Sequence, residues 1–246
     1  YAKSIEPNRK RLAHILGLRE KRPSFSKSES YFEWRDLKSL HAPDAVNLRW
    51  TAFADVHGEG LMLGSLIGKR AGCVILLPDC EQTPEEFLTG DKKIAHAMAA
   101  RRLAESGFLV IVPSLIPRGE PLTQRERLYR SAFELGRGLI AYEVQKVLSA
   151  VDMVEQQKAF QVSGDTQIGI AGWGEGALIA LYAAALDQRI DAALVSGYFG
   201  DRRQIWQEPI DRNVFGLLAQ FGDAELATLI APRQLIVEAA RGPQRN

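Results

Sequence analysis

The chain has 246 residues, 46% of them hydrophobic, with 31 Lys and Arg against 30 Asp and Glu, a composition typical of one α/β domain with a sizeable core. A net charge of +1 with scattered basic residues argues against a nucleic-acid-binding protein. No apolar run reaches the ~18 residues that cross a bilayer, so we expect neither a membrane span nor a signal-peptide core.

The first 44 residues are predicted to form an N-terminal helix and a linker, ahead of an α/β domain over residues 45–246. Ile5, Leu12, Ile15 and Leu18 recur at roughly helical spacing before a serine-rich stretch, which indicates a peripheral helix. Because the chain begins at Tyr1 instead of Met, we expect that a leader or an upstream segment has been removed. Further domains of a longer chain are a second hypothesis for its partners.

The pattern from residue 46 onward predicts strands that alternate with helices. Residues 46–53 alternate as a strand does, residues 57–60 are predicted to form a turn, and a return strand follows. Further strands are predicted at residues 73–77, 108–112, 168–171, 192–195 and 234–238, and helices at residues 91–106, 129–156, 175–185, 214–221 and 224–230. This alternation favours a mostly parallel sheet with right-handed crossovers and helices on both faces.

The two cysteines, Cys73 and Cys80, lie on and just beyond one extended segment. Two cysteines that close on one strand cannot approach to disulfide distance, so neither a disulfide nor a metal site is expected.

Residues 167–185 form the most informative stretch, a short apolar strand followed by a glycine-dense turn and an Ala/Leu helix. The spacing of Gly172, Gly174 and Gly176 resembles the nucleophile elbow G-x-S-x-G of the α/β-hydrolases. In that turn the central residue has strained dihedral angles, and the flanking residues must be small. Gly174 tolerates the backbone but has no atom that can attack a carbonyl.

Other parts of a Ser-His-acid triad are incomplete as well. The four histidines all precede the turn, whereas the triad histidine follows the final strand. Glu238 and Asp201 are candidates for the acid, although each is also explained as an ordinary loop carboxylate. Glu175 is expected to offer its backbone N–H as an oxyanion donor, with its side chain directed elsewhere.

Candidate pocket residues follow the predicted strands. Asp79, Cys80 and Gln82 follow residues 73–77, where an α/β-hydrolase keeps its second oxyanion N–H. Trp173 and Tyr198 lie near the carboxyl ends of later strands, and could line a cleft or belong to the core.

The glycines also satisfy the dinucleotide fingerprint G-x-G-x-x-G/A, with Ala177 as the last member. That fingerprint normally follows the first strand, and the acidic residue expected after the next strand comes late, at Asp201. A dinucleotide-binding domain is therefore a minor alternative, and no cofactor is expected.

The chain resembles the dienelactone hydrolase and acetyl xylan esterase branch of the α/β-hydrolases over roughly residues 45–243. The resemblance is carried by the glycine turn and by residues 77–84, 132–148 and 229–233. It implies a carboxylic ester hydrolase, a serine where Gly174 stands, and a final strand with its histidine beyond Asn246, so the sheet is expected to lack its last strand. The resemblance also suggests a secreted or periplasmic protein.

These observations leave several hypotheses open. The first is a hydrolase domain with an elbow that is inactive, or that works through an attacking group delivered near Gly174. The second is a non-catalytic pseudo-hydrolase module that binds a small ester, an acyl group or a glycan. The third is that Gly174 was introduced to disable an enzyme.

Overall fold

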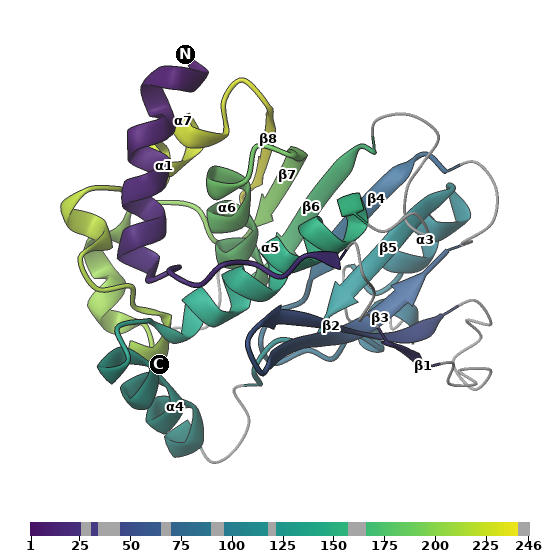
Figure 1. The fold of residues 1–246 in the computed structure, drawn as a ribbon, viewed down its shortest axis with the longest axis horizontal. Coiled ribbons are helices and arrows are strands. Elements are labelled where there is room, and N and C mark those ends of the chain that lie inside the picture. The colour runs from purple at the N-terminus through teal and green to yellow at the C-terminus, as the bar shows by residue number, and fades with distance from the viewer. Residues whose placement is uncertain are drawn as a thin grey trace.

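The computed structural model describes residues 1–25, 31–33, 45–64, 70–89, 96–117, 122–156 and 166–240. These residues form one eight-stranded sheet with helices on both faces, which confirms the predicted fold class (Figure 1). The strands are β1 (Tyr31–Glu33), β2 (Val46–Phe53), β3 (Val56–Leu63), β4 (Gly72–Leu77), β5 (Phe108–Pro113), β6 (Ile168–Trp173), β7 (Ile190–Ser196) and β8 (Gln234–Glu238). The α-helices are α1 (Ala2–Leu16), α2 (Glu86–Thr89), α3 (Ala99–Glu105), α4 (Leu122–Glu134), α5 (Leu139–Gln156), α6 (Glu175–Leu186) and α7 (Asp223–Ile230). Short 3-10 helices are η3 (Arg202–Gln207), η4 (Ile210–Arg212) and η5 (Leu217–Ala219). None of these described helices is long and apolar enough to cross a membrane.

The order of strands places the carboxyl ends of the central strands together. The order is β1-β2-β3-β5-β4-β6-β7-β8, antiparallel from β1 to β5 and parallel from β5 to β8. The parallel strands β4 and β5 are the predicted continuous apolar runs, as expected where both faces of a strand are covered. At the carboxyl edge of strands β4, β6, β7 and β8, the aligned residue pairs are Leu77 with Gly172, Trp173 with Ser196, and Ser196 with Glu238. Whether a further strand follows β8 stays a prediction.

Two hydrophobic clusters cover the two faces of the sheet. Helices α1, α5, α6 and α7 share the larger cluster on one face, and α2 and α3 share the smaller cluster on the other. Helix α6 lies within the larger cluster, and every residue from 175 to 185 is buried. Its Ala/Leu composition explains this position, because a helix that is apolar all round must be covered all round.

The carboxyl end of α6 is held by two arginines that are distant in sequence. Arg9 of α1 donates from Nε to the carbonyl oxygen of Ala185 at 3.2 Å, and Arg233 donates from Nη2 to that of Ala184 at 2.7 Å. Cations at this end complement the negative end of the helix dipole. The N-terminal helix therefore contributes to the stability of the central helix.

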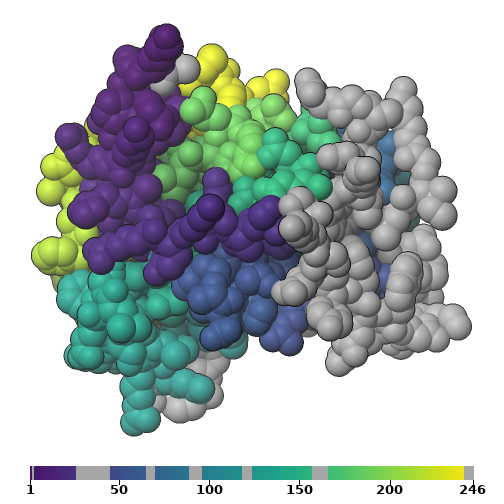
Figure 2. All heavy atoms as spheres, viewed as in Figure 1, coloured from purple at the N-terminus to yellow at the C-terminus, as the bar shows by residue number. Residues whose placement is uncertain are grey.

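The N-terminal helix lies at the surface, as predicted, and its apolar side is buried against the rest of the domain. Ile5, Leu12 and Leu16 of α1 are buried in the larger cluster, and Figure 2 shows the segment lying across one face of the molecule. Strand β1 lies in the predicted linker but pairs with β2. Helical spacing indicated the helix correctly but could not indicate what covers its apolar side. The division of the chain at residues 44 and 45 stays a prediction.

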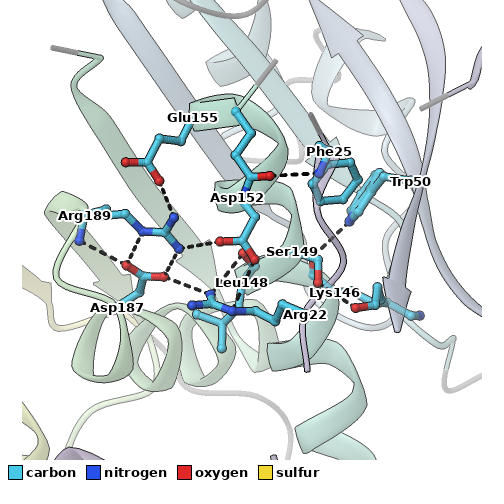
Figure 3. Close-up of polar contacts among 12 residues, drawn as sticks. Arg22, Phe25, Trp50, Lys146, Leu148, Ser149, Asp152, Glu155, Asp187 and Arg189 are labelled. Carbon is cyan, nitrogen blue, oxygen red and sulfur yellow. Dashed lines mark hydrogen bonds and ion pairs between the residues drawn. The ribbon is translucent and has the colours of Figure 1, made fainter. Parts of the chain in front are cut away.

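A cluster of charged side chains fastens the residues after α1 to α5 and to the end of α6 (Figure 3). Arg22 lies 3.2 Å from the carboxylate of Asp152 and 3.0 Å from that of Asp187. Arg189 contacts the same two carboxylates at 2.6 Å each. Burial acts to raise the pKa of Asp187, but Arg189 and Arg22 outweigh it and hold the pKa at about 2. Burial raises the pKa of Asp152 against the pull of the same arginines.

Several element boundaries differ from the prediction, among them the predicted helix over residues 214–221, of which only η5 is helical. The hairpin turn lies at Ala54 and Asp55, and residues 57–60, predicted as the turn, belong to β3. The predicted helix over residues 129–156 is two helices, because Gly136 takes a left-handed φ of 78° between α4 and α5. The predicted helix over residues 91–106 is described only from residue 96 onward, and its helical part there is α3.

The low pKa of Asp187 predicts a pH-dependent contribution to stability. Since the folded state favours the ionised carboxylate, the contribution is complete above the unfolded pKa of about 4 and is lost as the pH falls through about 2. We expect Asp187→Asn to lower the free energy of unfolding by about 2 kcal/mol at pH 7, and by little at pH 2, in urea denaturation. Asp152→Asn is the control and should show the opposite pH trend. A difference that stays constant with pH would contradict an ionic origin.

Candidate functional site

Strand β6 passes into α6 through a tight turn at residues 172–176, called here the β6–α6 turn. At its centre Gly174 has φ 54° and ψ −122°, a conformation that residues with a side chain rarely adopt. Its N–H donates to the carbonyl oxygen of Ser196 in β7 at 3.1 Å. The turn predicted from the glycine pattern is therefore present at the carboxyl edge of the sheet.

Gly172 and Gly176 allow this turn because nothing larger fits at either position. A Cβ on Gly172 would lie 2.2 Å from the carbonyl oxygen of Gly176, and a Cβ on Gly176 would lie 2.3 Å from that of Pro78. Helix α6 consequently begins in contact with the end of β4. The first N–H groups of α6 then lie beside the loop that follows β4.

The carboxylate of Asp79 occupies the space next to Gly174. Its Oδ1 accepts hydrogen bonds from the N–H of Glu175 at 2.9 Å and the N–H of Cys80 at 2.8 Å. A Cβ on Gly174 would lie 2.5 Å from Cγ of Asp79. A side chain at position 174 and Asp79 in this position therefore exclude one another.

Gln82 and two stacked rings lie next to Asp79. Oε1 of Gln82 accepts from the N–H of Asp79 at 3.1 Å and lies 3.1 Å from Nε2 of His96. The His96 ring stacks on Trp173, the last residue of β6, with ring centroids 4.3 Å apart. Burial lowers the pKa of His96 against the opposite influence of carboxylates that include Asp79 and Glu238. The imidazole is therefore neutral at pH 7.

The side chain of Glu175 belongs to a buried ionic cluster. Its carboxylate contacts Arg125 of α4 and lies 2.9 Å from Nε of Arg212 in η4. Arg125 also lies 2.6 Å from Asp211. Burial acts to raise the pKa of Glu175, but the two arginines outweigh it and lower the pKa. Glu175 thus offers its N–H to the turn, while its side chain joins α4 and η4 to the start of α6.

Glu238 ends β8, two strands from the turn. Its Oε2 accepts from the hydroxyl of Ser196, and its carbonyl oxygen accepts from the N–H of Gly197 at 3.2 Å. It lines a cavity of about 210 Å³, to which Tyr198 and Phe199 also contribute. Among the candidate acids, Glu238 is linked through Ser196 to the backbone of the turn.

Asp201 and Tyr198 have contacts of a structural kind. Asp201 is exposed and accepts from the N–H of Arg203 at 2.9 Å, so it caps η3. Tyr198 is buried, and its hydroxyl donates to Glu208 at 2.6 Å. The guanidinium of Arg202 lies 4.0 Å from the centroid of the Tyr198 ring. These contacts account for both residues without a chemical role.

The part of the chain that the structure describes also bears on the metal and dinucleotide alternatives. No group of three or more His, Cys, Asp or Glu is placed there to hold a metal ion, and both cysteines are buried and form no disulfide in that part. The dinucleotide alternative does not fit the geometry. Its glycines follow the sixth strand, and the N–H of Glu175, which would face a pyrophosphate, donates to Asp79.

Sequence reasoning grouped some of these residues correctly and missed others. Asp79, Cys80, Gln82 and Trp173 meet around Gly174, because they end neighbouring parallel strands. The sequence indicated a role for the backbone near Asp79, but the side chain is the group that fills the site. His96 was missed because its position depends on how the chain returns after β4, and Arg125 and Arg212 were missed because no local pattern signals their contact with Glu175.

Solved structures share this architecture at low sequence identity. A protein from Bacteroides fragilis, assigned as an acetyl xylan esterase, matches with a TM-score of 0.71 and 15% identity over 96% of this chain and 68% of its own. A methylesterase matches with a TM-score of 0.59 and 14% identity over 96% of this chain and 50% of its own. Acetyl xylan esterase 1 from Thermoanaerobacterium sp. matches with a TM-score of 0.57 and 10% identity over 98% and 89%.

The sheet order, the β6–α6 turn and these likenesses define an α/β-hydrolase fold. The sequence profile of the dienelactone hydrolase family matches residues 88–241, which is more than half of the chain. The chain therefore belongs to the dienelactone hydrolase family. No curated protein matches it in sequence. The chain spans about half the length of the methylesterase that it resembles.

The buried cluster around Glu175 predicts a large loss of stability when its charge is removed. We expect Glu175→Gln to lower the free energy of unfolding by roughly 3 kcal/mol, because Arg125 and Arg212 would stay buried with less counter-charge. Urea denaturation measures the loss. Glu126→Gln is the matched control, since its partner Arg130 is exposed on the same helix α4 as Arg125 and such pairs contribute little. Equal effects of the two substitutions would contradict the structural role of Glu175.

Proposed function

We propose that this chain is an α/β-hydrolase domain of the carboxylic ester hydrolase type, and that it does not hydrolyse esters by serine chemistry. The observation that carries the proposal is Gly174 itself. It has the strained backbone of a nucleophile elbow, between a parallel strand and a fully buried helix, and no side chain. The resemblance to acetyl xylan esterases and dienelactone hydrolases supports the type of reaction that relatives with a serine at this position would perform.

The remaining groups do not replace the missing serine. Acyl transfer needs a nucleophile, a general base and donors for the developing oxyanion. The donors fit the N–H groups of Cys80 and Glu175, but both already bind Oδ1 of Asp79. Asp79 therefore cannot attack an ester carbonyl from this position and leave the same donors free for the carbonyl oxygen.

Among the described residues, no histidine is hydrogen-bonded to a carboxylate, as the base of a triad is. Nε2 of His96 lies 3.1 Å from Oε1 of Gln82, so an amide and not a carboxylate orients this imidazole. Glu238, the best candidate for the acid, is bonded to Ser196 instead of a histidine. The groups that surround Gly174 therefore favour a pseudo-hydrolase.

A second candidate function is a non-catalytic module that binds a glycan or an acyl ligand. The cavity of about 210 Å³ beside Glu238 favours it, because aromatic and carboxylate groups line it together, including Phe199 and Asp201. Aromatic faces and a few fixed polar groups are what small-ligand sites in proteins usually offer.

Hydrolysis of 4-nitrophenyl acetate tests the proposed function. We expect the unaltered chain to release 4-nitrophenol at the uncatalysed rate. Gly174→Ser should do the same, because the new Cβ would meet Asp79 and the oxyanion donors would stay occupied. With Asp79→Ala added, Gly174→Ser should release at most about one equivalent per chain, since no histidine–carboxylate pair is formed among the described residues to activate water against an acyl-serine. Turnover by the unaltered chain that is lost in Asp79→Asn or Glu238→Gln would overturn the proposal.

A further inference from the structure

An exposed apolar surface lies where the end of α4 meets the turn before η5. The rings of Phe133 and Phe215 pack edge to face there, with centroids 6.0 Å apart, although Phe133 is 47% exposed and Phe215 is 81% exposed. Leu135, the residue after α4, is 75% exposed, and Leu218 of η5 is 46% exposed. These four residues are called here the α4–η5 patch. Exposed apolar patches of this kind mark surfaces that bind a protein or a membrane.

Phe215 lies at a turn that is anchored on both sides. Val214 packs against the larger hydrophobic cluster, and Leu217 is buried in it. Between them Gly216 has a left-handed φ of 80°, which turns the chain sharply. The backbone is therefore held by the core, while the ring between these anchors faces solvent.

The α4–η5 patch borders basic side chains of the N-terminal segment. The guanidinium of Arg19 lies against the end of α4, since a Cβ on Gly136 would lie 3.2 Å from its Nη1. Arg11 of α1 donates from Nη1 to Oε1 of Gln220, just after η5, at 3.2 Å. Both arginines are exposed. Each of the two segments that form the patch therefore has an exposed arginine beside it.

The N-terminal segment carries a large excess of positive charge. Residues 1–22 contain seven Lys or Arg and two Glu, a net charge of +5, so the rest of the chain, whose total is +1, has a net charge of −4. Both glutamates pair with buried arginines, Glu6 with Arg9 and Glu20 with Arg137. Figure 2 shows this segment in purple beside the region of α4 in teal, on one face of the molecule. The exposed basic residues of the segment are Lys3, Lys10, Arg11, Arg19 and Lys21.

This combination fits an anionic bilayer better than a second copy of the chain. Aromatic and leucine side chains enter the boundary between headgroups and acyl chains, while Lys and Arg beside them contact anionic headgroups. A two-fold contact through the patch would instead bring two segments of charge +5 together, and like charges repel across an interface.

We propose that the α4–η5 patch and the exposed basic residues of positions 1–22 form a binding surface for an anionic phospholipid bilayer. The rings of Phe133 and Phe215 enter the interface, and Arg11 and Arg19 contact lipid headgroups at its edge. This inference goes beyond the proposed function, since it concerns another surface and requires no catalysis.

Cosedimentation with vesicles tests the proposal. The vesicles contain equal parts of phosphatidylglycerol and phosphatidylcholine, and vesicles of phosphatidylcholine alone are the reference. We expect an association constant at least about tenfold larger for the acidic vesicles, because several basic residues contact their surface. Sodium chloride should weaken this binding, since it shortens the Debye length from about 30 Å at 0.01 M to about 8 Å at 0.15 M.

Substitutions of exposed residues separate the patch from general attraction. Phe215→Ser, and Leu135→Ser as a second variant, should each lower the association constant about tenfold, because less apolar surface enters the bilayer. Arg19→Gln should lower it about fivefold and reduce its dependence on salt. The matched controls are Ile236→Ser, at a side chain 55% exposed on β8, and Arg102→Gln, exposed on α3; both should bind as the unaltered chain does. An unchanged Tm confirms that each variant is folded.

The proposal is overturned if the unaltered chain binds neutral vesicles as well as acidic ones, or binds neither. It is also overturned if the patch variants bind no more weakly than the controls. Sedimentation velocity without lipid gives a further decisive outcome, because a dimer that Phe215→Ser abolishes would show that a second copy covers the patch. Ester turnover by the unaltered chain would overturn the proposed function without deciding this result, so the two failures are distinguishable.

Discussion

The structure around the candidate site depends on one close approach of backbone, where the start of α6 meets the ends of β4 and β6. Gly172 and Gly176 make this approach sterically possible, and Gly174 provides the positive φ that turns the strand into the helix. Because the backbone is so near, the N–H groups of Cys80 and Glu175 converge on one point. In an elbow that carries a serine, the serine side chain lies beside these N–H groups. In this chain the carboxylate of Asp79 lies there instead.

Buried and half-buried ion pairs hold the parts of the chain that surround this turn. Glu175 binds Arg125 and Arg212, and so links α4 and η4 to the first residue of α6. At the opposite end of α6, Arg22 links the N-terminal segment to Asp152 of α5 and to Asp187, and Arg189 contacts the same two carboxylates. Such pairs are costly to break singly, since a remaining buried charge loses its partner. The elements around the turn are thus tied to it by charge as well as by apolar packing.

Membership of the dienelactone hydrolase family and a glycine at position 174 are compatible, because fold and chemistry depend on different residues. The fold needs the apolar strands, the buried α6 and the small flanking glycines, and all of these are present. The chemistry needs a nucleophile and a base at one edge of the sheet, and a fold can persist when these are replaced. In this chain the carboxylate of Asp79 accepts hydrogen bonds from the N–H groups of Cys80 and Glu175 beside Gly174.

The sequence by itself determined the fold class, most strands and the turn at Gly174, because apolar periodicity and glycine spacing are local and reflect backbone geometry directly. It also indicated which strand ends would meet, since parallel strands share an edge. Only the tertiary structure decided that the apolar side of α1 is buried against the core and that Glu175 pairs with Arg125 and Arg212. It alone placed His96 beside Gln82, and the carboxylate of Asp79 against Gly174. These contacts join side chains that are far apart in sequence, and no local pattern records the direction in which a loop side chain points.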